Sequence, residues 1–182
     1  MDADLAETLE ALHADSFGWA LHCCRGDRCR AEDVLQTAYL KLAEARCTPP
    51  DDRRSALKTW WFGVIRLTAM EDHRTVRSRR SLLERLLGRA ASRPEAVEIS
   101  PEPTPPMSAQ RNEQDDLLRR SLGQLSPRQA EVLHLTFYQG MTIGEAADVM
   151  GVGIGSARQH YERGKSRLRE LLEKEACDAN HA

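Results

Sequence analysis

Residues 125–172 read LSPRQAEVLHLTFYQGMTIGEAADVMGVGIGSARQHYERGKSRLRELL, and this stretch decides the fold. The strings SPRQ (126–129) and TIGE (142–145) follow the capping-box pattern. In that pattern a hydroxyl and a side chain three residues later satisfy backbone N–H groups that a helix start leaves free. Apolar residues recur at helical spacing after each string. The stretch therefore predicts one helix from Pro127 to about Gly140 and a second, shorter helix that ends at Met150.

A tight turn, Gly151-Val152-Gly153, joins the short helix to a third helix that runs from about Ile154 to Glu175. Two helices around such a turn, the second of them basic, are typical of a helix-turn-helix. Ala157 and Tyr161 are expected to face the core. This leaves an outer face that consists of Ser156, Arg158, Gln159, Glu162 and Arg163. Arg and Gln can pair with guanine and adenine edges in a major groove, so the pattern favours DNA binding.

The net charge of −2 conceals a strong segregation of charge along the chain. Residues 66–93 carry eight Arg against three acids, and residues 154–169 carry five bases against one acid. Residues 1–16 carry five acids and no base, and residues 95–116 carry six acids against one base. Two basic blocks separated by an acidic one indicate two contacts with a polyanion.

The N-terminal half is also expected to be helical, over 3–24, over about 31–45, and from near Ser55 into the Arg-rich segment. Five prolines between Ser92 and Gln110 predict an extended linker. The predicted fold class is all-α, with two small helical domains joined by a Pro-rich linker. Their ranges are 1–91, 92–111 for the linker, and 112–182 for the helix-turn-helix domain.

No stretch reaches the length of about 18 apolar residues that a membrane span needs, and the acidic N-terminus does not read as a secretory signal. We therefore expect a cytoplasmic protein without membrane insertion. The sequence contains no P-loop, paired-His metal motif or nucleophile elbow, so an enzyme is the least favoured class.

The five cysteines are too irregularly spaced for an obvious metal site. His22, Cys23, Cys24, Cys29 and Cys47 could supply enough zinc ligands, but there is no CxxC pair. The odd count fits a reducing compartment. We expect no metal and no cofactor, while a cysteine-based metal or redox sensor stays open as an alternative.

Three segments together resemble a known family. Residues 125–172 resemble region 4 of bacterial sigma-70 factors. AEDVLQTAYLKL (31–42) resembles region 2.2, and KTWWFGVIRLTAMEDHRTVRSRR (58–80) resembles regions 2.3 and 2.4. Their order, with a Pro-rich spacer between them, is typical of the extracytoplasmic-function (ECF) group. Leu67 stands where that family commonly has Asn, and Gly164 costs its helix about 1 kcal/mol relative to Ala.

The resemblance implies a protein without catalysis that binds core RNA polymerase, recognises promoter DNA and helps to open the duplex, often under the control of an anti-sigma factor. The polymerase-facing residues would be Glu32, Asp33 and Gln36. The loop 48–56 would read the −10 element. The single strand and its backbone would be contacted by Arg66, Arg74 and Arg77. The −35 element would be read by Ser156, Arg158, Gln159 and Arg163.

Two questions stay open at this point. A stand-alone helix-turn-helix regulator would share residues 112–182. Such a regulator usually dimerises and is basic, whereas this chain has no heptad pattern for a dimer and its pI is near 6.3. The run Trp60-Trp61-Phe62 sweeps about 200° of a helix, so one stripe cannot easily bury all three rings. One ring could stack on an unpaired base, and core packing is the other interpretation.

Overall fold

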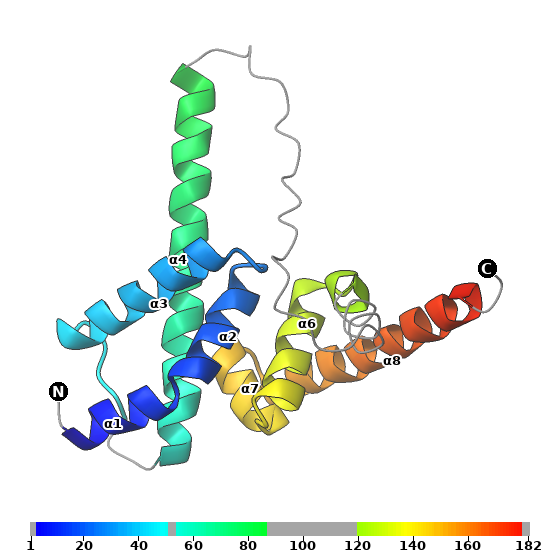
Figure 1. Ribbon diagram of the computed structural model, residues 1–182, viewed down its shortest axis with the longest axis horizontal. Helices are drawn as coiled ribbons and strands as arrows, with labels where there is room; N and C mark the ends of the chain where they lie inside the picture. Colours follow the sequence, from blue (N-terminus) through cyan, green and yellow to red (C-terminus); the bar gives the residue numbers. More distant parts are fainter. Residues whose placement is uncertain (1–2, 51–53, 87–119, 180–182) are drawn as a thin grey trace. The chain divides into compact units, whose positions relative to one another are not determined.

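The computed structural model describes residues 3–50, 54–86 and 120–179 (Figure 1). Regular structure in these ranges is helical throughout, which confirms the all-α prediction. The chain divides into two compact units, Met1–Pro101 and Glu102–Ala182. The predicted linker, 92–111, lies outside the described residues. None of the described helices has the length and apolar character that a bilayer crossing requires.

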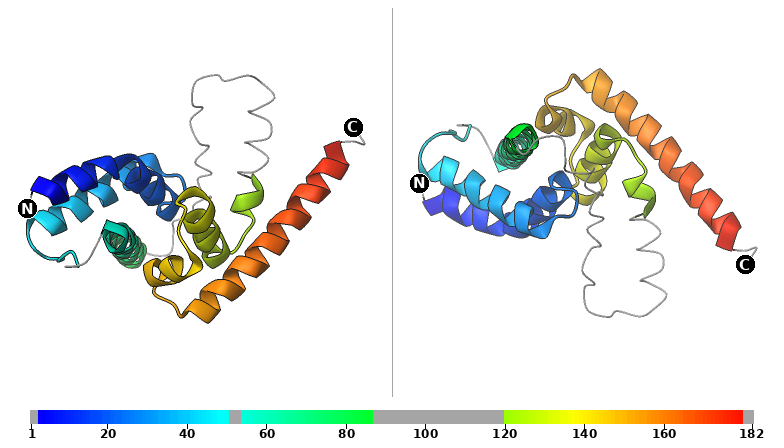
Figure 2. Two further views of the ribbon diagram at one scale, coloured as in Figure 1. Left: turned by 90° about the horizontal axis from the view of Figure 1, so that it is seen from below. Right: turned by 90° about the horizontal axis from the view of Figure 1, so that it is seen from above.

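The first unit contains α1 (Ala3–Ala11), α2 (His13–Cys23), α3 (Arg28–Ala43) and α4 (Arg54–Leu86). Helices α2, α3 and α4 pack against one another, and α1 packs against α2. Figure 1 shows that α4 runs past the other helices of this unit, so its C-terminal part extends beyond them. Figure 2 views α4 nearly along its axis, with α2 and α3 side by side next to it.

Buried aromatic residues hold the first unit together. Trp19, Trp61 and Phe62 have no exposed surface. The indole N–H of Trp19 donates to the carbonyl oxygen of Phe62 at 3.0 Å. The indole N–H of Trp61 donates to Ser16 Oγ at 2.9 Å, and that hydroxyl donates to the Leu12 carbonyl at 2.7 Å. The two indole N–H groups and the Ser16 hydroxyl therefore each have a hydrogen-bond partner, as a low-dielectric core requires.

Two helix boundaries differ from the sequence prediction. The expected helix over 3–24 is divided at Leu12, whose φ and ψ of −87° and 0° lie outside the regular helical values. The helix expected from about Ala31 begins at Arg28, because the Asp27 side chain caps it by accepting from the Arg30 N–H at 3.0 Å. The gap between the helices expected over 3–24 and about 31–45 is confirmed, since Arg25 and Gly26 both have positive φ.

The second unit contains a helical turn over 120–123, α6 (Pro127–Leu133), the π-helical η1 (His134–Tyr138), α7 (Ile143–Met150) and α8 (Ile154–Ala179). Helices α6, α7 and α8 all pack against one another. The single helix predicted up to Gly140 thus ends in a wider π-helical turn. Phe137, which a regular helix would place on the same face as the buried Leu133, is 62% exposed. The change of pitch over 134–138 alters the helical phase that the prediction assumed.

Gly164 lies where α8 packs closely against α6. A Cβ atom at this position would stand 3.1 Å from Gln129 Cβ and 3.2 Å from Leu133 Cδ1. The sequence suggests only a cost in helix propensity for this glycine. The structure shows that the missing side chain is what lets the two helices meet.

Gly164→Ala is expected to destabilise the second unit by about 1 kcal/mol, because overpacking of about 1–3 kcal/mol exceeds the helix-propensity gain of about 1 kcal/mol. Gly164→Val should cost more. The control is Gly155→Ala in the same helix, where an added Cβ meets nothing within 4 Å. Thermal unfolding followed by circular dichroism measures all three variants. A Gly164→Ala protein that melts at or above the wild-type temperature would contradict the packing role.

Candidate nucleic-acid interface

Two local features orient the helix-turn-helix. Thr142 Oγ1 accepts from the Glu145 N–H at 3.2 Å, and the Glu145 carboxylate accepts from the Thr142 N–H at 2.8 Å, which confirms the predicted capping box. Gly151 closes α7 with φ 63° and ψ 42°, in the left-handed region where glycine carries no steric cost. The Val152 N–H then donates to the Ala147 carbonyl at 3.0 Å. These bonds fix where α8 starts.

The buried residues of α8 define which side faces the core. Ala157 and Gly164 are buried, and Leu171 is 5% exposed. At about 100° per residue, Gln159 and Glu162 point away from Ala157 by about 160° and 140°. Both are exposed, and so are the remaining residues of the predicted DNA-reading face, Ser156, Arg158 and Arg163. The outward face predicted from the sequence is confirmed as a surface, and its contact with DNA stays a prediction.

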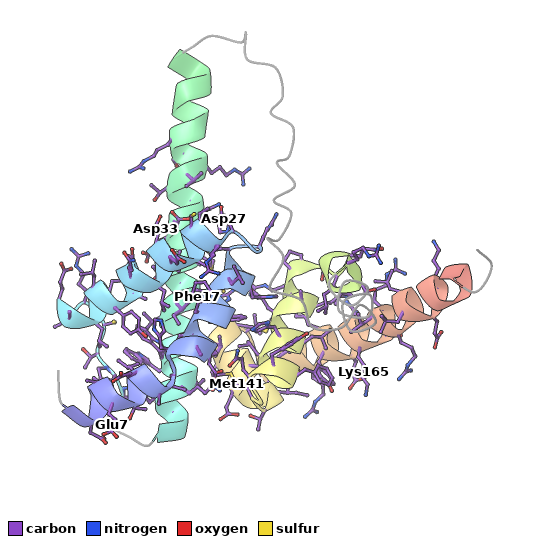
Figure 3. All side chains as sticks on the ribbon, viewed as in Figure 1. Glu7, Phe17, Asp27, Asp33, Met141 and Lys165 are labelled. Atoms are coloured by element: carbon purple, nitrogen blue, oxygen red, sulfur yellow. The ribbon has the colours of Figure 1, made fainter. Side chains whose placement is uncertain are left out.

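An aromatic and cationic cluster borders this face. The Phe137 ring stacks on the Tyr161 ring with centroids 6.0 Å apart. The Lys165 ammonium lies 5.9 Å from the centre of the same Tyr161 ring. Figure 3 shows Lys165 on α8. Tyr161 is therefore half-buried beneath exposed neighbours instead of lying within the core. Sequence periodicity misses the cluster because Phe137 belongs to the π-helical turn.

In the first unit, α4 brings only part of the predicted DNA-contacting set to the surface. Arg74 and Arg77 are exposed. Arg66 is 6% exposed, so in this structure its side chain is not on the surface that a DNA strand would meet. Ile65, Arg66 and Thr68 are all buried, so this part of α4 faces the other helices on more than one side. Leu67, in contrast, is 57% exposed and lies two helical turns before Arg74 on the same face.

Charged residues of α4 also hold α3 in place. Arg30 Nε donates to the Asp72 carboxylate at 3.1 Å, and this hydrogen bond raises the pKa of Arg30. The Lys41 ammonium donates to Glu71 Oε2 at 2.6 Å and to Thr68 Oγ1 at 3.0 Å. Glu71 and Asp72 therefore neutralise cations of α3 within the unit. They leave the arginines that follow in α4 as the cationic part of its exposed surface.

The residues predicted to face polymerase lie on the solvent side of α3. Glu32, Asp33 and Gln36 are exposed, and Glu32 pairs with Arg28 at 3.1 Å (Figure 3 labels Asp33). Leu40 lies on the same face, one turn after Gln36, and is 59% exposed. The sequence analysis passed over Leu40 because it reads as one more apolar residue of a helix. Its exposure gives this acidic face an apolar residue at its C-terminal end.

The aromatic run at the start of α4 divides between core and surface. Trp61 and Phe62 are fully buried, whereas Trp60 is intermediate and packs beside Trp61 with ring centroids 6.1 Å apart. Core packing therefore accounts for two of the three rings. Of the loop 48–56, residues 51–53 lie outside the described part of the chain.

Comparison with known proteins identifies relatives along most of the chain. Residues 121–170 match the family described as Sigma-70, region 4. RNA polymerase sigma factor CarQ of Myxococcus xanthus is 28% identical over 173 residues, which cover 93% of this chain and 90% of CarQ. RNA polymerase sigma factor SigZ of Bacillus subtilis (strain 168) is 22% identical over 147 residues, which cover 81% of this chain and 75% of SigZ.

A solved structure shares the fold. The sigma factor RpoE of Bartonella quintana, crystallised in complex with the anti-sigma factor NepR, matches with a TM-score of 0.66 and 23% identity. The match covers 94% of this chain and 98% of that one. At this identity the likeness concerns the helical fold.

The cysteines do not form a metal-binding group within the described ranges, where no cluster of three or more His, Cys, Asp or Glu is placed to hold an ion. Cys24 is buried, and burial raises the pKa of its thiol to about 11. Burial also raises the pKa of Cys47. Cys29 is exposed. Because the thiolate is the reactive form, the buried Cys24 is expected to be chemically inert.

Alkylation with iodoacetamide at pH 8 should therefore modify Cys29 much faster than Cys24, by at least about a factor of one hundred, because a pKa near 11 leaves few Cys24 thiolates. Peptide mass spectrometry over a time course measures each rate. Alkylation in denaturant is the control and should equalise the two cysteines. Comparable rates in the native protein would contradict the buried, inert thiol and revive the redox alternative.

Proposed function

We infer that this chain, a member of the sigma-70 superfamily of the ECF type, is a transcription initiation factor that binds core RNA polymerase, recognises promoter DNA and assists duplex opening. One observation carries the inference. The second unit is a capped helix-turn-helix whose second helix exposes a polar and basic face, and it coincides with the match to Sigma-70 region 4 over 121–170. An α-helix with such a face fits the width of a major groove.

We propose that the second unit reads the −35 element through Ser156, Arg158, Gln159 and Arg163. The support is their common exposure on one side of α8, opposite Ala157. Gln159 is nearest the middle of that side, and Arg158 and Arg163 are nearer its edges. This arrangement suits a central residue that reads base edges and flanking cations that also bind phosphates.

For the first unit we propose two contacts. The solvent face of α3, with Glu32, Asp33, Gln36 and now Leu40, would bind a basic surface of core polymerase, with Leu40 as an apolar contact at one end. Arg74 and Arg77 of α4 would contact the −10 region, without Arg66, whose side chain is buried. The domain ranges 1–91 and 112–182, with 92–111 as the linker between the two promoter elements, remain part of this proposal.

The protein would act in the cytoplasm with the polymerase and would catalyse no reaction of its own. The crystallised relative RpoE is bound by the anti-sigma factor NepR. We propose by analogy that an anti-sigma factor holds this chain inactive. A stand-alone operator-binding regulator is the competing function, and dependence on polymerase separates the two.

Specific promoter binding should appear only with core polymerase. The net charge of −2 and the lone helix-turn-helix of the described residues provide little affinity for DNA by themselves. Gel shifts on a promoter library, with and without core enzyme, followed by run-off transcription, measure this. Specific binding by the chain alone, with no transcription on any promoter, would identify a stand-alone regulator instead.

Gln159→Ala should weaken use of the −35 element in a sequence-dependent manner, by about 1–3 kcal/mol on the preferred promoter and little on a promoter changed at the contacted base. Arg167→Ala is the comparison, because this exposed arginine pairs with Glu170 at 3.0 Å and is expected to act uniformly. Run-off yields on a panel of −35 variants measure both. A uniform loss for Gln159→Ala would mean that the residue contacts backbone only.

Leu40→Ala should weaken binding to core polymerase by about 1–3 kcal/mol, because a largely exposed leucine becomes buried when its face is covered. The matched control is Leu67→Ala, which removes an equally exposed leucine from α4. Competition for core enzyme against a labelled wild-type chain measures affinity. Unchanged competition by Leu40→Ala would remove this residue from the polymerase-binding face.

A further inference from the structure

We propose that Glu162 of α8 determines base specificity, by accepting a hydrogen bond from the exposed amino group of a cytosine in the major groove of the −35 element. The proposal rests on the proposed function, and it assigns to Glu162 a role beyond the four residues placed on that face above. Three observations carry it: the direction of the side chain, its freedom from ion pairs, and its spacing from Gln159.

The direction follows from the packing of α8. Glu162 points about 140° away from the buried Ala157, so it is nearer the centre of the outward face than Arg158, at about 100°. Glu162 is exposed. Any duplex that contacts Gln159 and Arg163 therefore meets the Glu162 carboxylate in the same groove.

Three other acidic residues of the second unit have internal uses. Glu131 pairs with Arg128 and Glu170 pairs with Arg167, each at 3.0 Å, and Glu145 caps α7. Among the described residues Glu162 has no such ion pair or hydrogen bond. Its carboxylate is therefore available to a ligand and contributes no visible contact to the fold.

A carboxylate at this place is selective because most of a duplex repels it. It is repelled by phosphates and by the N7 and O6 acceptors of guanine, and it accepts readily from the N4 amino group of cytosine. Such a residue lowers the affinity for promoters without cytosine at the contacted position more than for promoters with it. This repulsion is one of the two ways in which an interface becomes specific. Arg158, Arg163 and Lys165 nearby supply the compensating attraction to phosphates.

The spacing links Glu162 to the neighbouring contact. Gln159 precedes it by three residues, which is a rise of about 4.5 Å along the helix axis. Successive bases on one strand are about 3.4 Å apart. Gln159 and Glu162 are thus placed to read bases that are adjacent or nearly adjacent, with adenine as the natural partner of Gln159 and cytosine as that of Glu162.

The test uses polymerase holoenzyme assembled with full-length protein and a promoter library randomised across the −35 element, with transcripts counted by sequencing. Wild type is expected to prefer cytosine at one position by about tenfold, a typical cost of a single mismatched pair. Glu162→Gln and Glu162→Ala should each reduce this preference to less than about twofold, with other positions unchanged. Glu173→Gln removes the same charge from α8 about 16 Å further along, and should leave the profile as it is.

Three results would overturn the proposal. They are a wild-type profile without a cytosine preference, a cytosine preference that both Glu162 variants retain, and an equal change at every position, which would reduce Glu162 to a general repulsion of phosphate. Failure of the proposed function looks different, because the wild-type holoenzyme would then give no transcript from any member of the library.

Discussion

The rotation of α8 about its own axis is fixed where α6 passes so close that position 164 accommodates no side chain without displacing Gln129 or Leu133. Everything exposed on α8 follows from that contact. A rotation by one residue, about 100°, would move Ala157 out of the core and turn an outward polar residue into it. Gln129 takes part twice, because its side chain also accepts from the Ser126 N–H at 3.1 Å and so fixes the start of α6. The cap of one helix and the orientation of another therefore depend on the same residue.

In the first unit, hydrogen bonds between buried polar groups fix the orientation of the helices. The indoles of Trp19 and Trp61 each need an acceptor inside an apolar core, and they find it on a neighbouring helix or on Ser16. A sliding of α4 against α2 would leave an N–H unpaired, at a cost of about 1–3 kcal/mol. These directional bonds specify how the helices meet, which apolar packing alone does poorly. Leu67 stays on the outward side of α4 in this arrangement.

Local sequence patterns predicted most of the helices, both helix starts around the turn, the left-handed Gly151 and the outward face of α8. These features depend on residues near one another in the chain. The failures involve contacts between distant residues or a change of helical pitch. Arg66 belongs to a basic segment of the sequence, but it is buried in the folded unit. Gly164 is meaningful only beside Leu133, and Phe137 left the core because η1 is π-helical.

The continuity of α4 gives its arginines a mechanical role. From Ile65 in the core to Arg77 the chain forms one uninterrupted helix, so the backbone between them has no hinge. The part of α4 that carries Arg74 and Arg77 therefore moves as one rigid rod with the buried part of the same helix, a lever anchored in the packed centre of the unit. A partner that tilted the packed centre would therefore turn the exposed end of α4 by the same angle and move it through a larger distance. The ion pair of Arg30 with Asp72 lies between the two and couples α3 to this lever.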